Sequence, residues 1–107
     1  MRKVALITDG WKRYLTYAWP SGIMQRIQET EEDVNLYIFS SSGNWNKDQG
    51  YNRAEYNIFN LPDFCDFDGI ILELNNISSQ PIFDEVIQRA GKASVPVVSI
   101  ANELEDF

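Results

Sequence analysis

Three short apolar runs and one mixed run, spread over the whole chain, are the feature that most restricts its fold. They cover residues 4–7, 36–39, 70–72 and 95–100, and they are bounded mainly by Asp, Gly, Asn or Ser. Continuous apolar runs of this length are typical of strands that are buried on both faces, as in a parallel sheet. The sequence therefore predicts four parallel strands.

Segments with helical character separate these runs. The clearest lies before the last run, where apolar residues at helical spacing predict a helix from Pro81 to Ala90 that Gly91 caps. Its apolar stripe consists of Phe83, Val86, Ile87 and Ala90.

Two further helices are predicted from weaker patterns. A helix over residues 52–61, ended by Pro62, would place Tyr51, Ala54, Ile58 and Leu61 on one stripe. The first helix ends in the acidic run 29–33, which we interpret as a solvated end. It begins either near Pro20, or near residues 12–14 with a kink at Pro20.

The predicted order is β-α-β-α-β-α-β. With right-handed crossovers this order gives an α/β fold, a three-layer open sheet of parallel strands with helices on both faces, as in Rossmann-like proteins. A chain of 107 residues is long enough for one real core and well short of two domains.

Composition removes several functional classes. The chain has no His and one Cys, so it can form neither a Ser-His-Asp triad nor a His-ligated metal site, and we expect no cofactor. The net charge of −7 leaves no basic surface for nucleic acid. No apolar stretch approaches the ~20 residues of a membrane span. We expect a cytoplasmic protein in which Cys65 is a buried free thiol.

Polar and aromatic residues follow all four predicted strands. In open α/β sheets, ligands bind beyond the carboxyl ends of the strands. Amides and carboxylates there form directional hydrogen bonds, while an aromatic face covers the C–H side of a ring. The pattern predicts a polar small-molecule ligand such as a sugar. The polar stretch 40–50 is long enough to suggest a functional loop.

Plainer interpretations of the same residues stay open. Asp9-Gly10 and Asn75-Asn76 are also typical of simple turns, and Trp19 suits a core or an interface. An enzymatic alternative would need Asp9 to converge with Glu73 or Glu103 for acid-base work. We expect no catalytic residue and no enzyme.

Two motifs resemble a known family. The stretch 67–72, Phe-Asp-Gly-Ile-Ile-Leu, and the stretch 95–100, Val-Pro-Val-Val-Ser-Ile, are similar to a pair of motifs in type I periplasmic-binding-protein-like domains, the sensor domains of lactose-repressor-family regulators. The resemblance covers essentially residues 1–107. One departure is Ala101-Asn102, where the family often has Asp-Arg.

The resemblance implies that residues 1–107 are the N-terminal lobe of a two-lobed sensor, which binds a sugar or another small effector in the cleft between the lobes. Such lobes belong to transcriptional regulators, or to signalling proteins with a nucleotide-cyclising output domain of the diguanylate-cyclase type. The alternative is a dimerisation or interaction module, and a homodimer is compatible with both. The ligand contacts that the resemblance implies are Asp9, Trp11, Tyr14, Ser41, Asn75 and Asn102.

Overall fold

The computed structural model describes residues 1–9, 13–41, 50, 54–74, 77 and 79–100, and for residues 9 and 13–17 it describes the backbone. Within these residues, four strands form one parallel sheet with the order β2-β1-β3-β4. The strands are β1 (Arg2–Asp9), β2 (Val34–Ser41), β3 (Gly69–Glu73) and β4 (Val97–Ser99). Each contains residues of one of the predicted runs, so the prediction of four parallel strands is confirmed.

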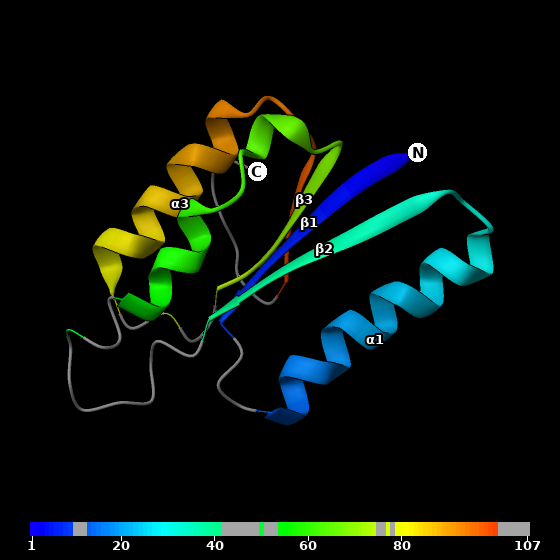
Figure 1. Ribbon diagram of the computed structural model, residues 1–107, viewed down its shortest axis with the longest axis horizontal. Coiled ribbons are helices and arrows are strands. Elements are labelled where there is room, and N and C mark those ends of the chain that lie inside the picture. Colours follow the sequence, from blue (N-terminus) through cyan, green and yellow to red (C-terminus); the bar gives the residue numbers. More distant parts are fainter. Residues whose placement is uncertain (10–12, 42–49, 51–53, 75–76, 78, 101–107) are drawn as a thin grey trace.

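Helices cover both faces of this sheet (Figure 1). One face carries α1 (Arg13–Thr30), and the other carries α3 (Gln80–Lys92) with the 3-10 helices η1 (Tyr56–Asn60) and η2 (Phe64–Asp66). The chain moves from β1 to β2 in one direction and then back past β1 to β3 and β4. Right-handed crossovers therefore place the first connection and the later ones on opposite faces. The predicted three-layer α/β fold is confirmed.

The main core lies on the α3 face of the sheet. Alternate residues of β1 and β3 point to this face, where helix and 3-10 segments cover them. Tyr56 and Phe59 of η1 stack with ring centroids 5.9 Å apart. The buried set is Ala5, Ile7, Tyr56, Phe59, Phe64, Phe67, Ile70, Leu72, Leu74, Val86, Ala90 and Ala93.

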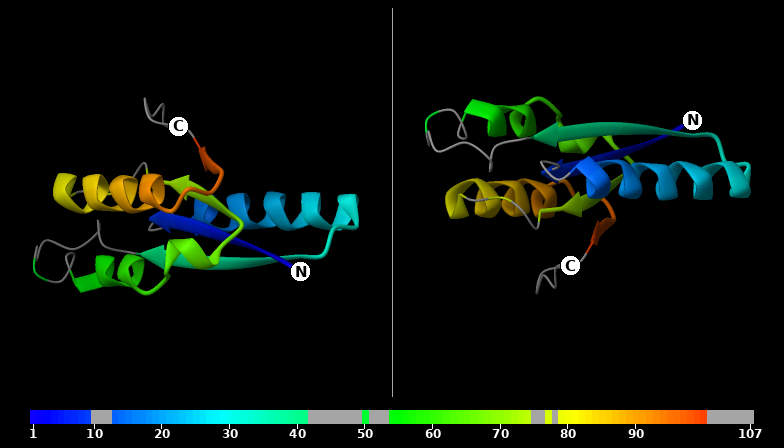
Figure 2. Two further views of the ribbon diagram at one scale, coloured as in Figure 1. Left: turned by 90° about the horizontal axis from the view of Figure 1, so that it is seen from above. Right: turned by 90° about the horizontal axis from the view of Figure 1, so that it is seen from below.

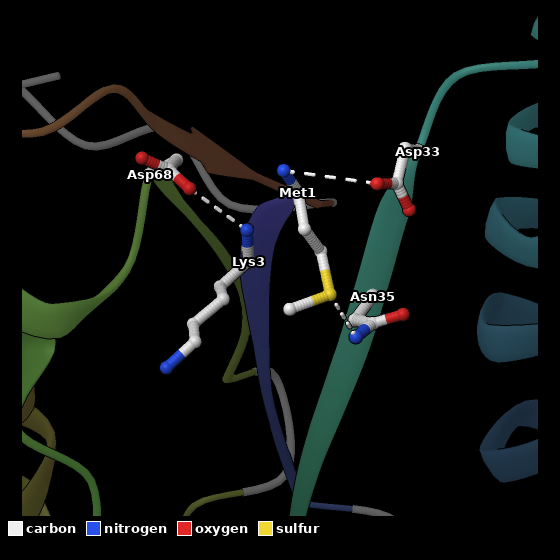
Figure 3. Close-up of polar contacts among 5 residues, drawn as sticks. All are labelled: Met1, Lys3, Asp33, Asn35 and Asp68. Atoms are coloured by element: carbon white, nitrogen blue, oxygen red, sulfur yellow. Dashed lines mark hydrogen bonds and ion pairs between the residues drawn. The ribbon is translucent and has the colours of Figure 1, made fainter.

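Hydrogen bonds at the amino ends of the strands fix how β1 pairs with its neighbours (Figure 3). The backbone N–H of Lys3 donates to Oδ2 of Asp68, and the N–H of Asp68 donates to the carbonyl of Lys3, both at 2.8 Å. The N-terminal ammonium lies 3.7 Å from the carboxylate of Asp33. The Asp68-Gly69 pair of the sequence motif thus joins β3 to β1 at the end of the sheet opposite the predicted ligand site.

The prediction that every strand is buried on both faces is wrong for the two edge strands. The central strands β1 and β3 carry the fully buried residues Leu6, Ile7 and Leu72. On the edges, Tyr37 and Ile38 of β2 are 37% and 47% exposed and Val98 of β4 is 60% exposed. An edge strand has one neighbour, so part of its surface stays open even when its residues are apolar.

The second predicted helix is partly wrong. Its predicted end before Pro62 holds, but residues 56–60 form a 3-10 helix instead of α-helix. The predicted stripe is wrong at Ala54 and Leu61, which are exposed, whereas Ile58 packs against the core and Tyr51 lies outside the described residues. Tyr56 and Phe59 are buried instead, because three residues per turn bring positions i and i+3 onto one face.

The first and third helices follow the predictions closely. Helix α1 begins at Arg13, the earlier of the two predicted starts, and contains Pro20. The acidic residues 29–33 are exposed, as predicted. Helix α3 contains the predicted span 81–90, with Pro81 in its first turn. Gly91 is not the cap, because the helix continues to Lys92 and ends at Ala93.

The prediction of a buried Cys65 thiol is wrong. Cys65 is exposed in η2, and the buried position in this 3-10 helix belongs to Phe64. The carboxylate of Asp63 caps η2 by accepting the backbone N–H of Cys65 at 3.0 Å. No described helix combines the length and the apolar character that crossing a membrane requires.

Candidate functional site

The carboxyl ends of β1, β2 and β3 lie at one end of the sheet, as parallel strands require. The connections after β1 and β3 leave in opposite directions, since β1 leads to β2 on one side and β3 leads to β4 on the other. The gap between β1 and β3 is therefore the point where the strand order reverses. Open α/β sheets bind their ligands at this point, because diverging connections leave a crevice there.

A buried polar pair spans this reversal point. Thr8 and Glu73 are register partners on β1 and β3, and their exposed fractions are 2% and 4%. The Thr8 hydroxyl donates to Oε2 of Glu73 at 2.7 Å. A carboxylate removed from water needs such donors, since burying it without hydrogen bonds is costly.

The pair lies on the α1 face of the sheet. Thr8 is two residues from the fully buried Leu6, and neither residue belongs to the main core on the α3 face. The register of the two strands holds the pair in place, because Thr8 and Glu73 are the next partners on this face after Leu6 and Ile71.

A third buried polar residue stands at the end of β2. Ser41 is 1% exposed and is the register partner of Asp9. Its strand neighbour Ser40 pairs with Thr8. Thr8, Ser41 and Glu73 are all the buried polar or charged residues in the described part of the chain. All three lie at the carboxyl ends of their strands, Thr8 and Glu73 on the α1 face of the sheet and Ser41 on the opposite face.

The structure brings together two of the six predicted ligand contacts. Asp9 and Ser41 are adjacent on neighbouring strands. Tyr14 is in the first turn of α1. The positions of Trp11, Asn75 and Asn102 lie outside the described residues, and so does most of the loop 40–50.

Thr8 and Glu73 are not among the six predicted contacts. Both follow apolar runs at strand ends, so their place in the sheet was predictable. Their burial and their mutual hydrogen bond were not, because these depend on a register between strands 65 residues apart. A carboxylate directly after an apolar strand, opposite a hydroxyl after another, is the signal that could have found them.

A separate hollow of about 460 Å³ lies beside η1. None of the six predicted residues lines it. It borders the exposed Leu61, whereas the polar pair is buried at the strand ends. The lining residues are Ala54, Glu55, Asn57, Ile58 and Leu61.

The described residues contain no group of three or more Cys, Asp or Glu side chains placed to hold a metal ion. For the enzymatic alternative, the register pairs Asp9 with Ser41 and not with Glu73. Glu103 lies outside the described residues.

No family model matches this chain, and no curated protein and no solved structure is significantly similar to it.

Proposed function

We propose that this chain is a ligand-sensing lobe, which binds a small polar molecule of the sugar class at the carboxyl ends of its strands. Binding is not followed by chemistry. Ligand binding changes the contact between this lobe and a second lobe or a second copy, and that change alters the activity of an output domain. The output is either DNA binding or nucleotide cyclisation, carried by another segment of the protein.

The observation that carries this proposal is the concentration of buried polar side chains at one end of the sheet. Polar side chains are buried at a cost, and here Thr8 and Glu73 flank the reversal point between β1 and β3, while Ser41 lies at the same end of the neighbouring strand β2. The opposite end of the sheet carries exposed polar contacts, such as Asp68 with Lys3. Fixed donors and acceptors at the carboxyl end are what recognition of a hydroxylated ligand requires.

The proposal includes a cytoplasmic localisation of this lobe. The thiol of Cys65 is exposed, and exposed free thiols persist in reducing compartments.

The experiment is a thermal-shift screen of monosaccharides and nucleosides against the chain. A ligand that binds only the folded state stabilises it by about 2.7 kcal/mol at a hundredfold excess over Kd. We expect at least one hydroxylated ligand to raise Tm, and isothermal titration calorimetry to give a one-site isotherm.

Two matched variants locate the binding. Asp9→Asn alters the carboxyl end of β1, whereas Asp68→Asn makes the same change before the amino end of β3. We expect Asp9→Asn to abolish the ligand-induced shift and Asp68→Asn to keep it. A chain that no member of the panel stabilises, or equal loss of the shift in both variants, would refute the proposal.

A further inference from the structure

We infer that β2 is a pairing edge, through which two copies of this chain join their sheets with the two β2 strands antiparallel. This surface is distinct from the proposed ligand site. The edge lies on the outer side of β2, whereas the reversal point lies between β1 and β3.

Alternate residues of β2 direct their backbone groups away from the sheet. The N–H of Arg2 donates to the carbonyl of Asp33 at 2.9 Å, so the odd-numbered positions of this strand face β1. The positions between them, Leu36 and Ile38, direct their N–H and C=O groups to the outer edge. No strand of the described chain pairs there. Figure 2 shows β2 as the outermost strand on this side of the sheet.

β2 lacks the features with which edge strands avoid pairing. Its eight residues, Val34–Ser41, contain neither a charge nor a proline, and their register with β1 is continuous. Tyr37 and Ile38 are exposed along it. The other edge of the sheet is protected, because β4 has three residues and directly follows Pro96.

The distribution of charge favours a second copy in the antiparallel sense. The uncharged strand can approach its own copy although the whole chain carries a net charge of −7. Three exposed acidic residues, 31–33, precede it at one end. Parallel pairing would set the two acidic runs side by side, whereas antiparallel pairing separates them by the length of the strand. Two-fold symmetry then lets one surface serve both copies.

One register pairs the apolar residues best. With the two-fold axis at Tyr37, Leu36 of each copy lies opposite the partner's Ile38, and the two Tyr37 residues face each other as a non-hydrogen-bonded pair. A strand pair alone buries less than the roughly 1,000 Å² of a robust interface, so the dimer is weak and depends on concentration.

The first test is sedimentation velocity of the chain from about 1 to about 100 µM, the range of a weak interface. We expect a monomer–dimer equilibrium that Ile38→Pro abolishes. Proline removes an N–H that points away from β1, so the intrachain ladder stays intact and the far-UV spectrum is unchanged. Ile38→Val keeps the N–H and the dimer.

Val98→Lys is the control for adhesion through any exposed apolar residue of the sheet, since Val98 is more exposed than Ile38. This variant should dimerise like the wild type. The inference is overturned by a wild type that stays monomeric throughout, by a dimer that survives Ile38→Pro, or by dissociation in Val98→Lys.

The second test fixes the register by crosslinking in a Cys65→Ser background. Tyr37→Cys places two thiols across a pair with Cα atoms about 4.5 Å apart, within reach of a disulfide. We expect mild oxidation to give a covalent dimer. Asn35→Cys lies on the same strand and the same face, but in this register it faces the partner's Phe39 and should give no covalent dimer. Equal crosslinking of both variants, or none of Tyr37→Cys, contradicts the antiparallel pairing.

Discussion

The two faces of the sheet are packed to different degrees. On the α3 face, Val86 and Ala90 of the helix are 1% exposed, and buried aromatic rings from η1 and η2 complete the layer. On the other face, no residue of α1 between Ala18 and Thr30 is buried. The half-buried residues of that stretch form a narrow stripe: Trp19, Pro20, Ile23 and Ile27.

The same difference extends to polar groups. On the α3 side, Arg89 donates to the carbonyls of Phe59 and Pro62, and its guanidinium lies 4.5 Å from the ring centroid of Phe64. It thereby satisfies carbonyls at the end of a 3-10 helix. On the α1 side, the buried indole Nε1 of Trp19 has no partner in the described part of the chain. We infer that the α3 face supplies most of the stability of the fold.

The largest effect should come from opening the α3 face. Phe59→Ala removes a ring that is 1% exposed and stacked on Tyr56, and should lower the free energy of unfolding by about 3–5 kcal/mol. Ile27→Ala, at a half-buried position of α1, should lower it by about 1 kcal/mol. Urea unfolding followed by circular dichroism measures both. Equal losses would mean that the two faces are equally packed.

The second-largest loss of stability should come from replacing Arg89 on the α3 side, compared with Arg26 of α1. Arg89→Met keeps much of the side-chain volume but leaves two carbonyls without their charged donor, and should cost about 1.5–3 kcal/mol. Arg26 of α1 forms an exposed ion pair with Glu29 at 3.5 Å, so Arg26→Met should cost less than about 0.5 kcal/mol. The same urea titrations compare them. A loss in Arg26→Met as large as in Arg89→Met would contradict the difference between the faces.

A smaller effect should come from the buried Thr8–Glu73 pair at the strand ends on the α1 face. Thr8→Val keeps the shape of the side chain but removes the donor to Glu73, and should cost about 1–2 kcal/mol. Thr30→Val removes an exposed hydroxyl that donates to the carbonyl of Ile27, and should change stability by less than about 0.5 kcal/mol. A neutral Thr8→Val would show that Glu73 does not depend on this hydroxyl.

The fold could be predicted because its signals are local. Each strand is a short apolar run, and α3 shows apolar residues at helical spacing from Phe83 to Ala90. The 3-10 helix η1 was not predicted, because the apolar residues of this segment are compatible with α-helical as well as with 3-10 spacing. Contact of Tyr56 and Phe59 with the sheet decided between the two geometries, and tertiary contact cannot be read from a local pattern.

The location of the candidate site could be predicted, but the side chains that are buried there could not. Strand ends can be located from the runs, so Asp9 and Ser41 were expected at the same end of the sheet, and the structure pairs them. Which polar side chains become buried there depends on the strand order and register. Thr8 contacts Glu73 only because β3 pairs with β1. The sequence of neither strand predicts which strand it pairs with.

The smallest effect, and the one of opposite sign, should come from Gly22 in α1. It is exposed, its φ is not positive, and a Cβ added there would meet no atom within 4 Å. Gly22→Ala should therefore raise the free energy of unfolding by about 0.5–1 kcal/mol through helix propensity alone. Ser21→Ala, at the exposed neighbouring position, is the control and should give a smaller gain. Thermal unfolding at low protein concentration measures both changes. If Gly22→Ala instead destabilises the chain, other atoms must occupy the space beside Gly22 in solution. That result would contradict the looser packing of the α1 face.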